Sequence, residues 1–231
     1  MNANQKRYED LIKRFKKKCA TWNSQGIKTV FNEDLYCVQN IDDVKYIVVA
    51  DNPGENEKTE SRYLCESNEG NRSGHIARCI FSMIFRGESY LVLNKTPIFT
   101  PKTADLKGIQ ASALKETMEY MADLIYDINR INKHIQVYIF GIGKSFNSKK
   151  NCFQNRGIWK YFFARIKTLY NVDRLKWPII AKHFSIYSLF QDFIIEDTGE
   201  KMKFHDLCNE NAKDFLKAMG DLLYRNWLKN A

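Results

Sequence analysis

Residues 46–55, YIVVADNPGE, join an apolar run to a turn that begins with two polar side chains. An apolar run without polar alternation is typical of a strand buried on both faces, as in a parallel sheet covered by helices. Pro53 and Gly54 break the run, and Asp51 and Asn52 stand between the run and the break. We therefore predict a buried strand whose carboxyl end presents two polar side chains.

Apolar runs of this kind recur along the chain, separated by helical patterns. Further short, β-rich runs lie at residues 90–93, 135–140 and 179–181. Three amphipathic helices are predicted from apolar stripes at Tyr8, Leu11, Ile12, Phe15 and Cys19, at Leu114, Met118, Met121, Ile125 and Ile128, and at Phe215, Met219, Leu222 and Leu223. Strands that alternate with helices predict an α/β fold, a three-layer α/β/α domain with a central, mainly parallel four-stranded sheet. No linker is visible, so a single domain is expected over residues 1–231.

Polar residues follow each of the four predicted strands. They occur in DNPG at 51–54, NKTP at 94–97, GIGKS at 141–145 and KHFS at 182–185. The carboxyl ends of parallel strands lie at one edge of a sheet, where ligands commonly bind. Taken singly, a Pro-Gly pair is usually a turn and an Asn often a helix cap. GIGKS also lacks the first glycine of a phosphate-binding loop, because Tyr138 occupies that position. The placement of polar residues after all four predicted strands nevertheless favours a binding site.

Composition and charge narrow the classes of function. The chain has 231 residues, 44% of them hydrophobic, which argues against global disorder, and a formal net charge of +9, which is compatible with a polyanionic partner. Residues 141–182 contain ten Lys or Arg and a single acid, Asp173, although a merely solvated basic helix gives the same pattern. Without a signal peptide or a long apolar run, we expect a cytoplasmic location, nucleoid-associated in a bacterium, and no membrane partner. Six cysteines without a C-x-x-C pair favour free thiols over a metal site.

Four segments resemble the ordered motifs of the uracil-DNA glycosylase superfamily. They are ADNPG at 50–54, LNKTPIFT at 93–100, FGIGKSF at 140–146 and HFSIYS at 183–188. The resemblance runs from about residue 44 to residue 188, and its specific parts are the first and last motifs. Asn52 is similar to the residue of the mismatch-specific branch, which uses Asn-Pro-Gly. Ala50 stands where glycine is common in the family, and Phe184 where proline is usual.

The resemblance implies a monofunctional DNA glycosylase of base excision repair. Cleavage of an N-glycosidic bond leaves negative charge on the departing base and needs a water at the sugar. By the resemblance, His183 donates to the base carbonyl and Asn52 holds the water. An amide cannot act as a general base, so the chemical step is expected to be slower than with a carboxylate. Asp51 either reaches the water or only turns the chain, and Asn94 reads the base edge because a carboxamide both donates and accepts.

A glycosylase must also flip its target base out of the duplex. Tyr63 or Leu64 would stack on the base, and Tyr63 is the better physical candidate. Ile186 or Tyr187 would fill the gap left in the duplex, or else belongs to the core. The other residues assigned to base or DNA binding are Pro53, Gly54, Lys144, Lys149, Lys150, Lys182, Ser185 and Ser188.

These inferences predict a monomer that acts on a uracil-like, deaminated or otherwise damaged base in DNA, without a cofactor or metal. Two alternatives stay open. One is a non-catalytic DNA-binding protein that keeps the fold, and the other is an enzyme that hydrolyses free nucleosides.

Overall fold

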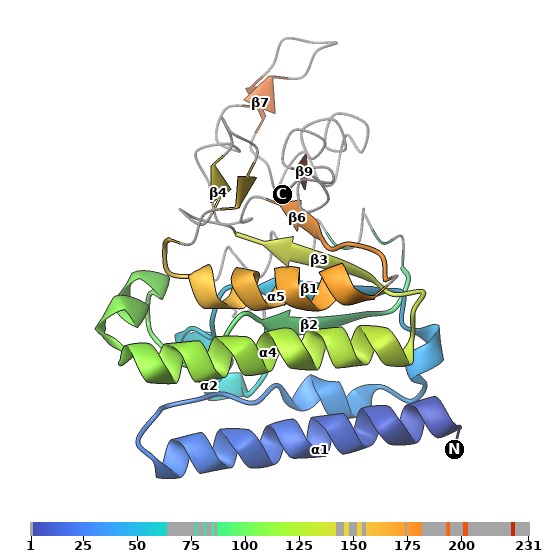
Figure 1. Ribbon diagram of the computed structural model, residues 1–231, viewed down its shortest axis with the longest axis horizontal. Helices are drawn as coiled ribbons and strands as arrows, with labels where there is room; N and C mark the ends of the chain where they lie inside the picture. Colours follow the sequence, from blue (N-terminus) through green and yellow to red (C-terminus); the bar gives the residue numbers. More distant parts are fainter. Residues whose placement is uncertain are drawn as a thin grey trace.

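A five-stranded sheet forms the centre of the molecule (Figure 1). The computed structural model describes residues 2–63, 77, 81, 85, 87–141, 146–147, 152–153, 156–173, 175–181, 193–194, 201–202 and 223–224. The strand order is β2-β1-β3-β6-β9, with β1 at Tyr46–Ala50, β2 at Tyr90–Asn94, β3 at Gln136–Phe140, β6 at Ile179–Ala181 and β9 at Leu223–Tyr224. The first four strands are parallel, and β9 is antiparallel to β6. The prediction of an α/β fold with a mainly parallel sheet is confirmed, and the two-residue β9 is an addition to the four expected strands.

The opening stretch forms the inner strand β1. It pairs with β2 through Tyr46 and Tyr90 and with β3 through Tyr46 and Gln136. Its residues from Ile47 to Ala50 are buried. An unalternating apolar run suits this position, because both faces of the strand are covered and both edges are paired.

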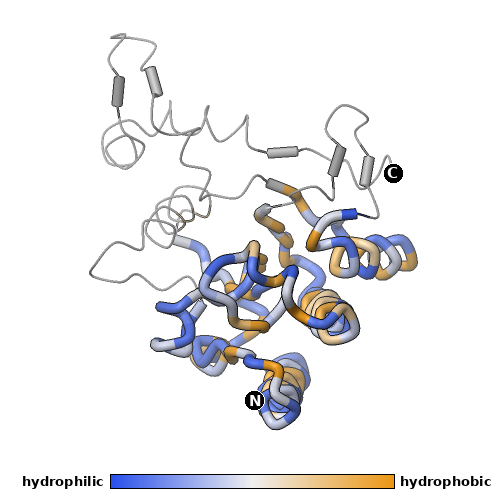
Figure 2. Tube along the Cα trace, turned by 90° about the vertical axis from the view of Figure 1, so that its left-hand side faces the viewer, coloured by the Kyte–Doolittle hydropathy of each residue, from blue (hydrophilic) through white to orange (hydrophobic). Residues whose placement is uncertain are grey.

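Three helices build the layer on one face of the sheet. They are α1 at Ala3–Ser24, α4 at Ala111–Ile131 and α5 at Lys160–Val172; α4 packs against α5, and α1 packs on α4. Every residue of the two predicted stripes in α1 and α4 is buried. Figure 2, where the helices are seen nearly end-on, shows hydrophobic and hydrophilic residues sharing the circumference of each helix, as amphipathic helices require.

Aromatic rings cover the opposite face of the sheet. Phe81 and Phe85 are helical and buried. The Phe85 ring stacks on that of Tyr46 with centroids 4.1 Å apart, and Phe81 meets Phe140 at 5.7 Å. Helical residues therefore lie on both faces, which is the predicted three-layer arrangement.

Shorter elements connect these layers. The described part of the chain contains the helix α2 at Glu55–Glu60 and 3₁₀ helices η1 at Glu33–Cys37, η2 at Ile41–Asp43 and η3 at Thr103–Gly108. Two small antiparallel pairs join β4 at Phe146–Asn147 to β5 at Cys152–Phe153, and β7 at Phe193–Ile194 to β8 at Lys201–Met202. Among the described residues, no helix is both long and apolar enough to cross a membrane. Cys19 and Cys37 are free thiols.

One predicted helix is wrong at its last residue. Leu223, assigned to an amphipathic stripe, belongs to β9 and pairs with Ala181. The other members of that stripe, Phe215, Met219 and Leu222, lie outside the described residues. A two-residue strand carries no periodicity of its own, and its partner is distant in sequence, so the local pattern could not reveal the pairing.

Candidate functional site

The residues that follow β1 and β2 meet at the carboxyl end of the sheet. Ala50 of β1 is opposite Asn94 of β2 in the register. The Lys95 backbone N–H lies 3.0 Å from both the Ala50 and the Asp51 carbonyl oxygens. Because the strands are parallel and end together, four polar residues stand at this edge of the sheet, and the side chains of Asp51 and Lys95 are in contact. We call Asp51, Asn52, Asn94 and Lys95 the strand-end cluster.

Asn94 has an unusual side chain within this cluster. It is fully buried, and neither its Oδ1 nor its Nδ2 has a hydrogen-bond partner in the part of the chain that the structure describes. A buried polar group without a partner costs about 1–3 kcal/mol. The Asn94 carboxamide thus has one donor group and one acceptor that the described residues leave unused.

Asn52 has one half of its carboxamide satisfied and the other half unpaired. Its Nδ2 lies 2.9 Å from Thr100 Oγ1 and 3.1 Å from the Pro53 carbonyl oxygen. Its Oδ1 is buried and has no hydrogen-bond partner among the described residues. Asn52 therefore presents an acceptor, which is the polarity that a bound water needs in order to donate a hydrogen bond.

Lys95 is a site residue that the sequence analysis did not single out. It is fully buried, and its Nζ lies 2.5 Å from Asp51 Oδ1 and also donates to the Phe140 carbonyl oxygen at the end of β3. The Trp159 ring covers the ammonium, with 4.7 Å from Nζ to the ring centroid. Burial lowers the pKa of Lys95, and the Asp51 carboxylate opposes that change.

This lysine ties three strand ends together. Lys95 follows β2, and its partner Asp51 follows β1. Lys95 also donates to the carbonyl oxygen of Phe140, the last residue of β3. The sequence contains one signal for a buried Lys95. The lysine directly follows an apolar strand, and Asp51 holds the same position after the neighbouring strand. The signal is weak, because a lysine after a strand is most often solvent-exposed.

Pro53 and Gly54 shape the turn after β1. The Pro53 carbonyl oxygen accepts from the Thr100 N–H at 3.3 Å as well as from Asn52. Gly54 is the N-cap residue of α2, and its N–H donates to Glu57 Oε2 at 2.6 Å. The N–H of Gly54 is therefore already used within the protein.

The structure argues against the predicted stacking role of Tyr63. The residue is 3% exposed, and its hydroxyl donates to the Val30 carbonyl oxygen at 2.6 Å. Burial raises the pKa of this phenol well above its usual range. A ring held in the core by its hydroxyl does not offer a free face to a base. Sequence position near the first motif could not distinguish a core tyrosine from a stacking one.

The remaining predicted site residues lie outside the described residues: Leu64, Lys144, Lys149, Lys150, Lys182, His183, Ser185, Ile186, Tyr187 and Ser188. Part of the basic stretch that contains several of them is described in α5. There Arg165 pairs with Asp123 at 2.8 Å, so this charge is engaged within the protein. In the described ranges, no group of three or more His, Cys, Asp or Glu side chains is suited to hold a metal ion.

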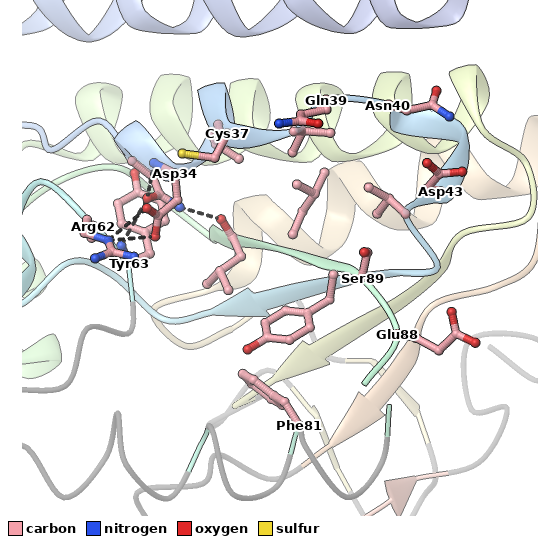
Figure 3. A pocket seen from close by; sticks show the side chains of 17 residues that line it. Asp34, Cys37, Gln39, Asn40, Asp43, Arg62, Tyr63, Phe81, Glu88 and Ser89 are labelled. Atoms are coloured by element: carbon pink, nitrogen blue, oxygen red, sulfur yellow. Dashed lines mark hydrogen bonds and ion pairs between the residues drawn. The ribbon is translucent and has the colours of Figure 1, made fainter. Parts of the chain in front are cut away.

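A cavity of about 520 Å³ lies along β2 and η1, and neither Asn52 nor Asn94 lines it (Figure 3). Figure 3 shows the ion pair of Arg62 with Asp34, 2.8 Å long, among its lining residues. Asp43 and Glu88 add two further carboxylates. The lining therefore holds more carboxylates than cationic groups, which disfavours phosphate groups in this cavity.

Comparison with known proteins gives no family assignment: no protein-family model matches the chain, and no curated protein is similar to it.

Proposed function

We propose that this protein is a DNA glycosylase that binds a flipped-out, uracil-like or otherwise damaged base at the strand-end cluster and hydrolyses its N-glycosidic bond. The observation that carries the proposal is the buried Asn94 carboxamide with an unpaired donor group and an unpaired acceptor. A base edge with a carbonyl next to a ring N–H would satisfy both with two hydrogen bonds. In the unbound protein the unpaired Asn94 amide costs free energy. Relief of this cost by the two hydrogen bonds would favour binding of the base.

The chemical step can be written around Asn52. The bond between the base nitrogen and C1′ breaks, and its electron pair leaves with the base. A water that donates to Asn52 Oδ1 adds its oxygen to C1′, and the proton that this water loses passes through solvent to the departing base anion. Asn52 cannot take that proton, because an amide is not a base at neutral pH. By the resemblance, His183 donates to the base carbonyl oxygen, where the negative charge develops.

Asp51 supplies the carboxylate nearest in sequence to Asn52. Its contact with Lys95 holds it beside the ends of β1 and β3. In the proposed reaction its negative charge favours the positive sugar of the transition state, while Lys95 offsets part of that effect. The net charge of +9 is compatible with DNA as the partner.

One observation favours a second candidate, a non-catalytic DNA-binding protein. Position 52 offers an acceptor but no group that can remove a proton. A protein that kept the residues for base binding and lost catalysis would have the same arrangement at position 52.

Incubation with damaged oligonucleotides tests the proposal. The panel carries uracil, mismatched thymine, hypoxanthine and alkylated bases, and alkali-sensitive cleavage reports abasic sites. We expect excision of at least one base, unchanged by a chelator. DNA binding without any abasic product would favour the binding protein, whereas release of bases from free nucleosides alone would favour a nucleoside hydrolase. Asn94→Leu serves as the matched variant that keeps the side-chain volume but cannot pair with a base.

A further inference from the structure

Resting on the proposed function, we infer that Thr100 is a positioning residue that sets which end of the Asn52 carboxamide faces the reacting water. The loop after β2, residues 95–102, carries this threonine beside the strand-end cluster. Thr100 itself is buried, and its described side-chain contacts are to Asn52 and to the backbone.

The hydrogen bonds of the Thr100 hydroxyl fix its polarity. Its Oγ1 lies 2.9 Å from the Lys102 carbonyl oxygen and 2.9 Å from Asn52 Nδ2. A carbonyl oxygen only accepts, so the single hydroxyl hydrogen is given to Lys102. Toward Asn52 the hydroxyl can then only accept. The atom of Asn52 that meets Thr100 must therefore be the NH₂ group.

Three backbone carbonyls impose the same orientation. The carbonyl oxygens of Pro53, Ile98 and Thr100 lie 3.1, 3.5 and 3.5 Å from Asn52 Nδ2. A carboxamide oxygen in that place would face three lone-pair oxygens without a hydrogen between them. The orientation that leaves Oδ1 available as an acceptor is thus favoured from both sides.

The loop that carries these groups is anchored at several points. The Phe99 N–H donates to the Lys28 carbonyl at 2.8 Å, and the Val30 N–H donates to the Pro97 carbonyl at 2.9 Å. Thr29 and Ile98 form an antiparallel bridge. Backbone pairing on both sides of Ile98 holds its carbonyl in place, and with it the environment of the Asn52 amide.

Thr100→Val and Thr100→Ser distinguish the effect of the hydroxyl on excision from the effect of side-chain volume. Valine keeps the volume without the hydroxyl, and serine keeps the hydroxyl. We expect Thr100→Val to lower single-turnover excision roughly ten- to hundredfold, as small misplacements of a reacting group do, with unchanged affinity for the same DNA. Thr100→Ser should restore most of the rate. Thr21→Val, which removes a threonine hydroxyl of α1 that donates to the Lys17 carbonyl oxygen of the same helix, should excise at the rate of the wild type.

A second readout does not depend on activity. The side-chain NH₂ signals of Asn52 in an NMR spectrum are identified by their loss in Asn52→Ala. In Thr100→Val they should shift and exchange faster with solvent, while Thr21→Val leaves them in place. Thr100→Ala offers the same test if the valine methyl does not fit.

The two readouts separate the two proposals. If the wild type excises no base, the proposed function fails, and the NMR signals still decide the role of Thr100. Unchanged Asn52 signals in Thr100→Val would overturn the positioning role. So would excision by Thr100→Val at the wild-type rate, or a loss of rate that serine does not rescue.

Discussion

Asn52 turns its amide nitrogen toward backbone carbonyls and keeps its oxygen for a partner. Catalytic chemistry alone would make a carboxylate at this position the faster choice, because a carboxylate can activate water. The surroundings favour the amide instead, since an ionised oxygen would lie against the carbonyls that now accept from Nδ2. The loop around position 52 therefore favours an amide there, independently of any reaction.

Asn52→Asp tests this at the level of stability. The carbonyl oxygens of Pro53, Ile98 and Thr100 and the carboxylate of Asp51 should raise the pKa of the new carboxyl above its unfolded value of about 3.9, while Lys95 opposes the change. An acid with a raised pKa in the folded state destabilises the fold when it ionises. Relative to wild type, the free energy of unfolding should fall as the pH rises above about 4 and level off beyond the raised pKa.

Urea unfolding between pH 4 and pH 8 measures this difference. Asn52→Ala is the control, because it loses the same contacts and adds no titratable group. If the aspartate and alanine variants differ from wild type by amounts that do not change with pH, the carbonyl environment does not select an amide.

Residue identities in the strand-end cluster were predictable to different degrees. Asp51, Asn52 and Asn94 stand directly after apolar strands, and the parallel topology brings such positions together. Lys95 was not predicted, because its burial depends on Trp159 and Phe140, which are distant in sequence. The burial of Tyr63, which argues against its predicted stacking role, likewise depends on a distant segment, because its hydroxyl donates to the Val30 carbonyl oxygen.

At the scale of elements, one buried ion pair links the ends of β1, β2 and β3. Lys95 is fully buried, and the side chain of Asp51 is 18% exposed. Removing one member of a buried pair leaves the other charge unpaired, which costs about 3–5 kcal/mol. Since Asp51 retains some access to water, Lys95→Met should cost an amount near the lower end of that range.

A double-mutant cycle measures the link. Asp51→Asn combined with Lys95→Met should destabilise the protein by less than the sum of the two single changes, because each single change already removes the same ion pair. Lys16→Met breaks the exposed pair with Glu33 and should change stability little. Additive single and double changes, measured by urea unfolding, would mean that Asp51 and Lys95 do not support one another.

The elements themselves could be read from periodicity where they are long or fully buried. The strand β1 has the predicted bounds, and α4 buries its predicted stripe. Periodicity could not predict β9, because this two-residue strand is defined only by its pairing with β6. Local patterns report which residues are buried, but they do not report pairing with a distant segment.

At the scale of the whole molecule, charge is the property that bears on DNA. If residues 141–182 meet phosphates, log affinity should fall linearly with log salt, with a slope of about −0.9 per neutralised phosphate on duplex DNA. Replacing Lys149 and Lys150 together by alanine should make the slope shallower. The matched control replaces Lys13 and Lys17, two exposed lysines of α1, and should leave the slope unchanged. If the Lys149/Lys150 variant has the same salt slope as the Lys13/Lys17 control, the basic stretch does not contact phosphates and is only a solvated face.

Single-turnover excision by the wild type, Asn52→Ala and His183→Ala on the same damaged duplex decides whether Asn52 and His183 act in catalysis. We expect each variant to bind this DNA nearly as well as the wild type does. Loss of the His183 donor should slow excision by about 10²–10³-fold, and loss of the held water in Asn52→Ala should slow it comparably. Excision at the wild-type rate by both variants would contradict the site even if the protein is a glycosylase, and Asp51 would then be the residue to test.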